Sequence, residues 1–402
     1  MEITNIEDFK HILQSGRLNF LIGSGLSTPF LKTLGDIENR LEELDTTKDC
    51  VAKELALASI IKVYFELCIS KNYELCHNQP EDCREVLNNY KAFLHNLNKI
   101  ILLRRSNLLS KQVNLFTTNV DIFLEKSLEE QHLEFNDGFT GTLKPSFELS
   151  NFKKSLYKTS PHYDIKSEVP VFNLFKLHGS VTWQLDSTES IKLDNKLDVL
   201  KSMRSSLNAL PKQLLHEATK DDGKNIKTIE ELLIEYQDEK IHEDVQLLLK
   251  NLKDCYARIP MINPTKEKFK FTTLNYTYYE LLRMFSNEIE RENSVLFVMG
   301  FSFADEHIRE IVLRAINSNP TLIVYIFPYD TKAKEQIKDY LKFKDCRPKN
   351  NNLKFVVHKD ETIKNDLANI NINYFENLAD SLINQRESSK TTTRDVDGEK
   401  NE

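Results

Sequence analysis

Six short, largely apolar runs constrain the fold of this chain more than any other feature of its sequence. Their apolar residues are continuous rather than alternating, a pattern typical of strands whose two faces are both covered by helices. Long helix-like patterns lie between most of them. The sequence therefore predicts an α/β fold with a doubly wound parallel sheet built from these runs. They cover residues 19–22, 113–116, 171–177, 295–299, 321–327 and 353–357.

Two long helix-like segments interrupt the predicted sheet. Residues 31–109 are rich in Leu, Ile, Lys and Glu and are too long for one crossover, so we expect a helical subdomain there. Residues 187–256 form a second charged segment with spaced apolar positions, which predicts a helical insertion. The core then consists of residues 1–30, 110–186 and 257–384. The tail, residues 385–402, has one apolar residue, Val396, and is expected to be disordered.

The charge balance argues against a general nucleic-acid binder. The chain carries 54 Lys and Arg against 61 Asp and Glu, a net charge of −7, whereas phosphate neutralisation favours basic proteins. A local basic patch, and with it direct DNA contact, stays open. No apolar run is long enough to span a bilayer, and the N-terminus lacks a signal-peptide pattern. We therefore expect a cytoplasmic protein without a membrane partner.

The six cysteines contain no CxxC pair, so the sequence predicts neither a zinc ribbon nor a redox motif. Cys68, Cys76 and Cys83 lie close to His77 in sequence, but without zinc-finger spacing. Buried thiols are favoured over a metal at these positions.

The first polar strand end is the segment Gly23-Ser24-Gly25, followed by Ser27. Glycines after a strand let the backbone approach a phosphate closely, and exposed N–H groups attract anions. The alternative is a strand-to-helix turn that binds nothing.

The second polar strand end is Thr118, Asn119 and Asp121. Helix capping is the alternative explanation, since Thr, Asn and Asp are preferred at helix starts. Capping accounts for one or two of these residues, but it does not require an amide and a carboxylate two positions apart.

The third and fourth strand ends carry a histidine and a small-residue turn. His178 follows an apolar strand and precedes Gly179, which suits a general base beside a ligand; a satisfied core histidine is the alternative. Gly300 and Ser302 form a turn that suits a ribose or an adenine.

Ligands of doubly wound sheets bind at the carboxyl ends of strands. Four polar strand ends in one chain therefore favour a nucleotide site.

These four segments, taken in order, resemble the motifs of the sirtuin (silent information regulator) family. The family's elements are Gly-Ala-Gly-hydrophobic-Ser, Thr-Gln-Asn-hydrophobic-Asp, His-Gly and Gly-Thr-Ser. The resemblance implies a Rossmann-like domain that binds NAD⁺ and cleaves its nicotinamide–ribose bond. The matching segments are Gly23-Ser24-Gly25 with Ser27, Thr118-Asn119-Val120-Asp121, His178-Gly179 and Gly300-Phe301-Ser302.

The resemblance also implies a role for each residue. Asn119 would position the nicotinamide ribose and an attacking water, Asp121 would support that pocket, and His178 would act as a general base toward a ribose hydroxyl. The remaining residues would bind NAD⁺: Gly23, Ser24, Gly25 and Ser27 at the pyrophosphate and nearby ribose, Gly300 and Ser302 on the adenosine side, and Thr118 within the same pocket.

Two departures from the family pattern argue against peptide deacetylation. The stretch after His178 has no cysteine before Cys255, so the family's two zinc CxxC pairs are missing and no zinc is expected. The family's peptide-pairing Val-Val-Phe-Gly-Glu segment is absent, and residues 259–268 read Ile-Pro-Met-Ile-Asn-Pro-Thr-Lys-Glu-Lys.

Two segments resemble the bacterial sirtuin-like NADases of anti-phage defence in particular: residues 274–285, Leu-Asn-Tyr-Thr-Tyr-Tyr-Glu-Leu-Leu-Arg-Met-Phe, and residues 300–308, Gly-Phe-Ser-Phe-Ala-Asp-Glu-His-Ile. This resemblance implies an NAD⁺ glycohydrolase that yields nicotinamide and ADP-ribose, a homo-oligomer, and a partner that is a HerA-type hexameric ATPase. Two alternatives stay open: a sirtuin-type protein deacylase or ADP-ribosyltransferase, and a non-catalytic module that senses NAD or ADP-ribose.

Overall fold

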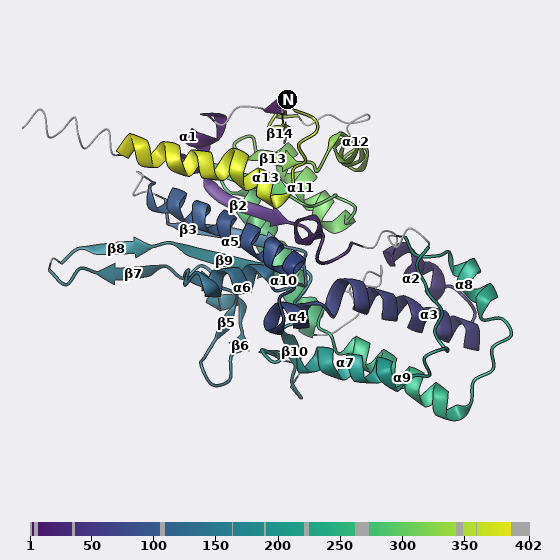
Figure 1. The fold of residues 1–402 in the computed structure, drawn as a ribbon. Helices are drawn as coiled ribbons and strands as arrows, with labels where there is room; N and C mark the ends of the chain where they lie inside the picture. The colour runs from purple at the N-terminus through teal and green to yellow at the C-terminus, as the bar shows by residue number, and fades with distance from the viewer. Residues whose placement is uncertain are drawn as a thin grey trace, which may run out of the picture.

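The fold is described from a computed structural model (Figure 1). It describes residues 2–3, 7–33, 37–104, 109–162, 164–188, 190–220, 225–261, 273–342, 349–358 and 360–386. Among these residues no helix is both long and apolar enough to cross a membrane.

The centre of the molecule is a parallel sheet, which confirms the predicted doubly wound α/β fold. Within the described residues it has eight strands, and every neighbouring pair is parallel. Six strands coincide with the predicted runs to within two residues at each end, and the two edge strands, β1 and β4, are additional. In sheet order the strands are β1 (Glu2–Ile3), β14 (Leu353–Val356), β13 (Ile323–Phe327), β12 (Ser294–Met299), β2 (Arg17–Ile22), β3 (Gln112–Thr117), β9 (Val171–Lys176) and β4 (Phe135–Asn136).

Helices cover both faces of the sheet, which explains why the strands are apolar throughout (Figure 1). Successive residues of β2 alternate between the two cores: Phe20 packs on one side and Leu21 on the other. One face is covered by α1 (Glu7–Ser15), α5 (Glu81–Leu102), α6 (Phe123–Glu130), α13 (Leu367–Ile370) and the π-helix η4 (Asn371–Glu376). The other is covered by α10 (Thr273–Glu290), α11 (Glu306–Ser318) and α12 (Thr331–Tyr340).

The strand order reverses between β2 and β12. From β2 the chain moves outward through β3 to β9, and it then returns to the other side of β2 and moves through β12 and β13 to β14. The carboxyl ends of β2 and β12 therefore lie side by side, since Ile22 pairs with Met299. Such a reversal point is where ligands of doubly wound sheets bind.

The two predicted helical segments pack against each other in one lobe (Figure 1). A buried hydrogen bond of 2.7 Å joins Ser59 of the first segment to Tyr236, which follows α8 in the second. α5, by contrast, covers the sheet, with Phe93 and Phe20 ring centroids 5.6 Å apart. The lobe comprises α2 (Ile37–Asp45), α3 (Val51–Tyr64), the π-helix η2 (Phe65–Ile69), α4 (Asn72–His77), α7 (Asp198–Ala209), α8 (Ile229–Glu235) and α9 (Glu243–Ala257).

Two small β structures were not predicted from the sequence. A hairpin of β7 (Leu156–Thr159) and β8 (Lys166–Val169) projects from the body of the molecule (Figure 1). An antiparallel sheet contains β10 (Trp183–Leu185), β11 (Ile191–Leu193), β6 (Ser146–Phe147) and β5 (Phe139–Thr140), and a short 3₁₀ turn, η3 (Leu149–Asn151), follows β6.

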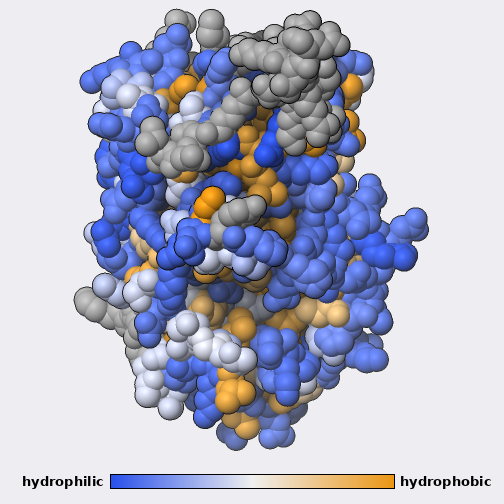
Figure 2. Space-filling model, turned by 90° about the vertical axis from the view of Figure 1, so that its left-hand side faces the viewer, coloured by the Kyte–Doolittle hydropathy of each residue, from blue (hydrophilic) through white to orange (hydrophobic). Residues whose placement is uncertain are grey.

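Figure 2 views the side that lies to the left in Figure 1, where hydrophobic residues form patches within a mainly hydrophilic surface.

The predicted C-terminal tail lies outside the described residues except for its first two. These two, residues 385 and 386, continue a helical stretch that covers residues 377–386.

Candidate active site

The glycine turns after β2 and β12 pack directly on each other at the reversal point. The N–H group of Gly23 donates to the carbonyl of Met299 at 2.9 Å, and that of Gly25 donates to the carbonyl of Gly300 at 3.0 Å. A Cβ atom on Gly23 would lie 2.3 Å from the Gly300 oxygen. Gly300 has φ +63°, in the left-handed region that favours glycine. These glycines are therefore required by the contact between the two turns.

The turn after β2 is shorter than the sequence suggests. Ser24–Ser27 forms one 3₁₀ turn, η1, and no α-helix begins there. Ser24 is exposed, Gly25 is half-buried and Ser27 is fully buried. Ser24 and Gly25 therefore face the solvent side of the turn, whereas Ser27 points into the protein.

The second polar segment contacts the first through side chains. Asn119 Nδ2 donates to the Gly23 carbonyl at 3.2 Å and to Ser27 Oγ at 3.4 Å. Ser27 Oγ donates to Asp121 Oδ2 at 2.7 Å. Asn119 is buried, yet its Oδ1 atom has no hydrogen-bond partner among the described residues. An unpartnered buried amide oxygen is costly, and a bound ligand or water would satisfy it.

Helix capping explains only part of this segment. Asp121 Oδ1 accepts a hydrogen bond of 3.2 Å from the N–H group of Phe123, the first residue of α6. The second oxygen of Asp121 and the Nδ2 atom of Asn119 contact the turn after β2 instead. Thr118 is half-buried, and its N–H group donates to the Ile22 carbonyl at 3.3 Å.

A buried lysine supports this turn, and sequence reasoning missed it. Lys176 Nζ, at the end of β9, donates to the carbonyl oxygens of Asn119, at 3.2 Å, and Asp121. It also forms an ion pair with Glu125 Oε1 at 3.0 Å. Burial raises the pKa of Glu125, and the charge of Lys176 opposes that rise. The signal available in the sequence was a lone lysine at the end of an apolar strand.

The His178 side chain is half-buried at the carboxyl end of β9. Its Nε2 atom lies 3.1 Å from Asp305 Oδ2, and the two side chains are 19% and 11% exposed. No hydrogen bond to Nδ1 of His178 is present in the described part of the chain. A fully enclosed core histidine would expose less of its ring, so the geometry favours a histidine at the wall of a site.

The turn that carries His178 is held tightly by its neighbours. Gly179 has φ +84°, and a Cβ atom there would lie 2.1 Å from the Pro260 carbonyl and 2.8 Å from the Tyr278 hydroxyl. Tyr278 is buried on α10, its hydroxyl has no partner among the described residues, and burial raises its pKa far above its usual range. Residues 259–268 stand where the family has its peptide-pairing segment. Of these, residues 262–268 lie outside the described residues.

Ser302 is the least engaged of the predicted residues. It is exposed, and its Oγ accepts a hydrogen bond of 3.3 Å from the N–H group of Ala304. Apart from Ser24 and Thr118, the other predicted residues form two groups at the same sheet edge, and the second group includes Asp305, which was not predicted. The first group is Gly23, Gly25, Ser27, Asn119, Asp121 and Gly300, and the second is His178 with Asp305.

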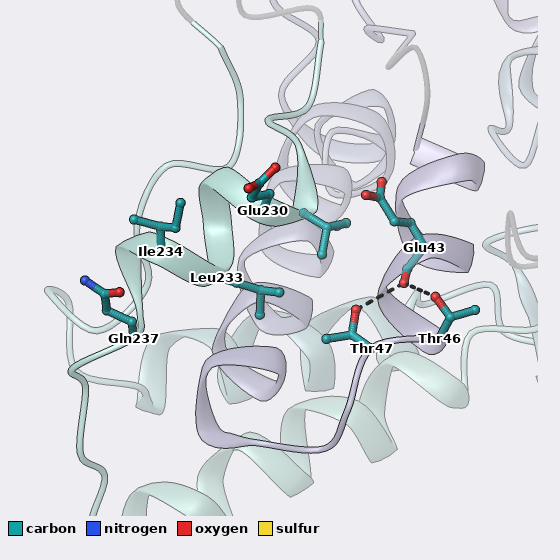
Figure 3. A pocket seen from close by; sticks show the side chains of 8 residues that line it. Glu43, Thr46, Thr47, Glu230, Leu233, Ile234 and Gln237 are labelled. Atoms are coloured by element: carbon teal, nitrogen blue, oxygen red, sulfur yellow. Dashed lines mark hydrogen bonds between the residues drawn. The ribbon is translucent and has the colours of Figure 1, made fainter.

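Two pockets of the described residues lie apart from the predicted site residues. One lies at the carboxyl ends of β13 and β14, on the same edge of the sheet, and its lining includes Tyr329, Lys334 and His358. The other is an open pocket in the lobe, between α2 and α8 (Figure 3). There the hydroxyls of Thr46 and Thr47 donate to the Glu43 carbonyl, and none of the predicted site residues lines it. None of the predicted site residues lines the pocket at β13 and β14 either. The candidate site is therefore defined by the side-chain contacts at the carboxyl ends of β2, β3 and β9, not by a pocket.

The described residues contain no group of three or more His, Cys, Asp or Glu side chains placed to hold a metal ion. Cys83 is buried, Cys68 is half-buried and Cys76 is exposed, so the prediction of buried thiols holds fully only for Cys83.

A doubly wound parallel sheet, with glycine turns and polar side chains gathered at its reversal point, defines a Rossmann-like nucleotide-binding protein. The profile of the SIR2-like domain matches residues 113–348, more than half of the chain. The chain therefore belongs to the SIR2-like domain family. A comparison with curated proteins finds no match.

Membership in this family indicates an NAD-related enzymatic function, because SIR2-like domains bind NAD⁺ and act as NAD-dependent enzymes. The matched region begins at β3, after the glycine turn of residues 23–27. The link between that turn and the matched region is structural: Gly23 and Gly25 contact Gly300, and Ser27 contacts Asp121.

Proposed function

We propose that this protein is an NAD⁺ glycohydrolase. The observation that carries the proposal is the Oδ1 atom of Asn119, which is buried without a partner among the described residues while the Nδ2 atom of the same amide contacts the glycine turn after β2. A hydroxyl group of the nicotinamide ribose, or the water that attacks it, would donate to this oxygen.

In the proposed reaction the bond between C1′ of the ribose and N1 of nicotinamide breaks, and its electron pair leaves with nicotinamide. Water adds to C1′ and loses a proton, so the products are nicotinamide, ADP-ribose and one proton. Asn119 positions the ribose and the water. His178 accepts a proton from a ribose hydroxyl, which stabilises the positive charge that develops at C1′.

The binding residues divide between the two ends of NAD⁺. Gly23, Ser24 and Gly25 bind the pyrophosphate, whereas Gly300 and Ser302 line the adenosine side. Ser27, which donates to Asp121, accepts from the Asn119 amide and so holds it, and Thr118 lines the same pocket. Ser27 positions Asn119 and does not itself contact phosphate, because it is fully buried and donates to Asp121.

Hydrolysis is favoured over protein deacylation by the sequence. The two CxxC pairs and the peptide-pairing segment of the deacetylases are both missing, as described above. Water is then the acceptor at C1′.

The biological part of the proposal follows from the resemblance to anti-phage NADases. We propose that the chain is a cytoplasmic homo-oligomer that assembles with a HerA-type hexameric ATPase and depletes NAD⁺ on infection. A compatible feature is the β7–β8 hairpin, in which Leu156, Tyr157 and Ile165 are exposed. An isolated two-stranded hairpin is marginal in water, so a partner would stabilise it.

The experiment that tests this function resolves the products of NAD⁺ by chromatography, with and without an acylated peptide and with and without a HerA-type partner. Nicotinamide and ADP-ribose in equal amounts, without peptide, support the glycohydrolase. Nicotinamide release that requires the peptide and removes its acyl group supports a deacylase. NAD⁺ binding without turnover, unaffected by His178→Ala, supports a sensing module.

A further inference from the structure

The contact between His178 and Asp305 joins two loops that are far apart in the sheet. His178 follows β9 and Asp305 follows β12, and β2 and β3 lie between those strands. The two loops must therefore lean toward each other across the carboxyl ends of β2 and β3. These are the strand ends that carry Gly23 and Asn119.

Each oxygen of the Asp305 carboxylate has a separate role. Oδ1 accepts a hydrogen bond of 3.1 Å from the N–H group of Ile308 and so caps α11. Oδ2 is the atom 3.1 Å from His178. α11 is anchored in the core through Ile308, Val312 and Ala315, which are fully buried. The carboxylate is therefore held by a rigid element rather than by a free side chain.

A carboxylate can only accept hydrogen bonds, so Asp305 Oδ2, 3.1 Å away, attracts Nε2 of His178 only when that nitrogen carries the proton. In the neutral imidazole the lone pair then lies on Nδ1, the atom that has no hydrogen bond within the described residues. A ring held in this tautomer can take a proton from a substrate hydroxyl through Nδ1.

We propose that Asp305 is a positioning residue that fixes the tautomer and orientation of His178 for proton transfer from the NAD⁺ ribose. This inference rests on the proposed function, in which His178 is the general base. It adds a residue that the motif comparison did not assign, and it names the nitrogen of His178 that faces the substrate.

Two substitutions separate the contact with His178 from the helix cap. Asp305→Asn retains the shape and caps α11 through its carbonyl oxygen, but its NH₂ group donates to Nε2 and so moves the proton of His178 to Nδ1. Asp305→Ser retains a good N-cap but is too short to hold the ring. The matched control is Asp366→Ser, because Asp366 caps α13 through a hydrogen bond of 2.8 Å to the N–H group of Asn369.

The first readout is the ¹⁵N NMR spectrum of the histidine side chains in the full chain, recorded where the rings are neutral. The His178 signal is identified by its absence in His178→Gln. We expect the Nε2–H form in the wild type and in Asp366→Ser, the Nδ1–H form in Asp305→Asn, and a mixture in Asp305→Ser.

The second readout is the rate of NAD⁺ cleavage. We expect Asp305→Asn to lose roughly 10²-fold in kcat with little change in KM, since the ring remains but in the wrong tautomer. Asp305→Ser should lose less, and Asp366→Ser nothing.

The inference alone is overturned if the wild type and both Asp305 variants hold the same tautomer. It is also overturned if the wild type is active and a variant with a changed tautomer cleaves NAD⁺ as fast. A wild type that cleaves no NAD⁺ under any condition overturns the proposed function and the role of Asp305 in it. In that case the NMR spectra still report whether the contact fixes the ring.

Discussion

At the scale of single residues, the site depends on a directional chain of hydrogen bonds. The Ser27 hydroxyl donates its one proton to Asp121, so it must accept from Tyr90, whose hydroxyl lies 3.1 Å away. Burial, and secondarily the charge of Asp121, raises the pKa of Tyr90 well above its usual range, which keeps this donor protonated. The amide of Asn119 is a second donor to the Ser27 hydroxyl. Ser27 is therefore the centre of the polar network.

We predict that Ser27→Ala destabilises the fold by about 1–3 kcal/mol, because it leaves buried Tyr90 and Asp121 oxygens without a partner. Tyr90→Phe removes only the outer donor and should cost less. Denaturant unfolding of both variants measures the difference. A Ser27→Ala variant as stable as the wild type would contradict the directional network.

A second prediction concerns the buried ion pair below the Asn119 turn. Lys176→Met leaves the Glu125 carboxylate buried and unpaired, and we expect a loss of about 3–5 kcal/mol. The double variant Lys176→Met/Glu125→Leu should recover much of that loss, because an apolar pair replaces the ion pair. It should nevertheless cleave NAD⁺ slowly, since the carbonyls of Asn119 and Asp121 have lost their donor.

Unfolding free energies and cleavage rates of the two variants test this prediction together. Full activity in the stable double variant would show that Lys176 does not position the turn.

At the scale of elements, the site is made by two turns that fit only because both are glycine-rich. A Cβ atom on Gly300 would lie 2.7 Å from the Leu26 nitrogen and 3.0 Å from the Gly23 oxygen. Backbone atoms cannot move aside as a flexible side chain can, so β2 and β12 would have to shift relative to each other. The geometry of the reversal point therefore depends on this position.

We predict that Gly300→Ala is more destabilising than Gly141→Ala by about 1–3 kcal/mol. Both glycines have positive φ, +63° and +99°, so both substitutions introduce backbone strain. At Gly141, however, the nearest atom to an added Cβ is 3.4 Å away, which is a short but ordinary van der Waals contact. Thermal unfolding of the pair isolates the clash, and equal losses would contradict it.

The sequence predicted the elements of the sheet better than the contacts between them. Continuous apolar runs located six strands because burial on both faces leaves no alternation to misread. Lys176 and Asp305 were missed as functional residues because their partners lie far away in the chain. The β7–β8 hairpin was missed because its residues are largely exposed and polar.

At the scale of the whole molecule, the helical lobe is connected to the sheet edge. Asn72 of α4 is fully buried, and its Oδ1 accepts a hydrogen bond of 3.2 Å from the N–H group of Ile122, beside Asp121. Lys71 donates to the carbonyl of Phe30, just after the glycine turn of β2, at 2.9 Å. The lobe thus contacts both loops that form the site. Anything that binds the lobe would be able to act on these loops.

We predict that Tyr236→Phe loosens both inserted segments together. The Tyr236 hydroxyl is hydrogen-bonded to Ser59 and accepts from the His216 N–H group at 2.5 Å, so its loss leaves two polar groups unsatisfied and costs about 1–3 kcal/mol. Hydrogen exchange should accelerate in α3 and α8 alike. Acceleration confined to α8 would mean that the segments open independently.

NAD⁺ hydrolysis at the edge of the sheet is tested by measuring NAD⁺ consumption by the full chain beside Asn119→Ala and His178→Ala, with a HerA-type partner present. We predict nicotinamide and ADP-ribose from the wild type, and rates reduced by at least ~10²-fold in both variants. His178→Ala should largely retain the fold because His178 lies at the wall of the site, and the rate of Asn119→Ala, which removes a buried amide, is taken on the folded protein. Undiminished cleavage by either folded variant would show that its side chain takes no part in the reaction, and no cleavage by the wild type would show that the protein is not an NAD⁺ glycohydrolase.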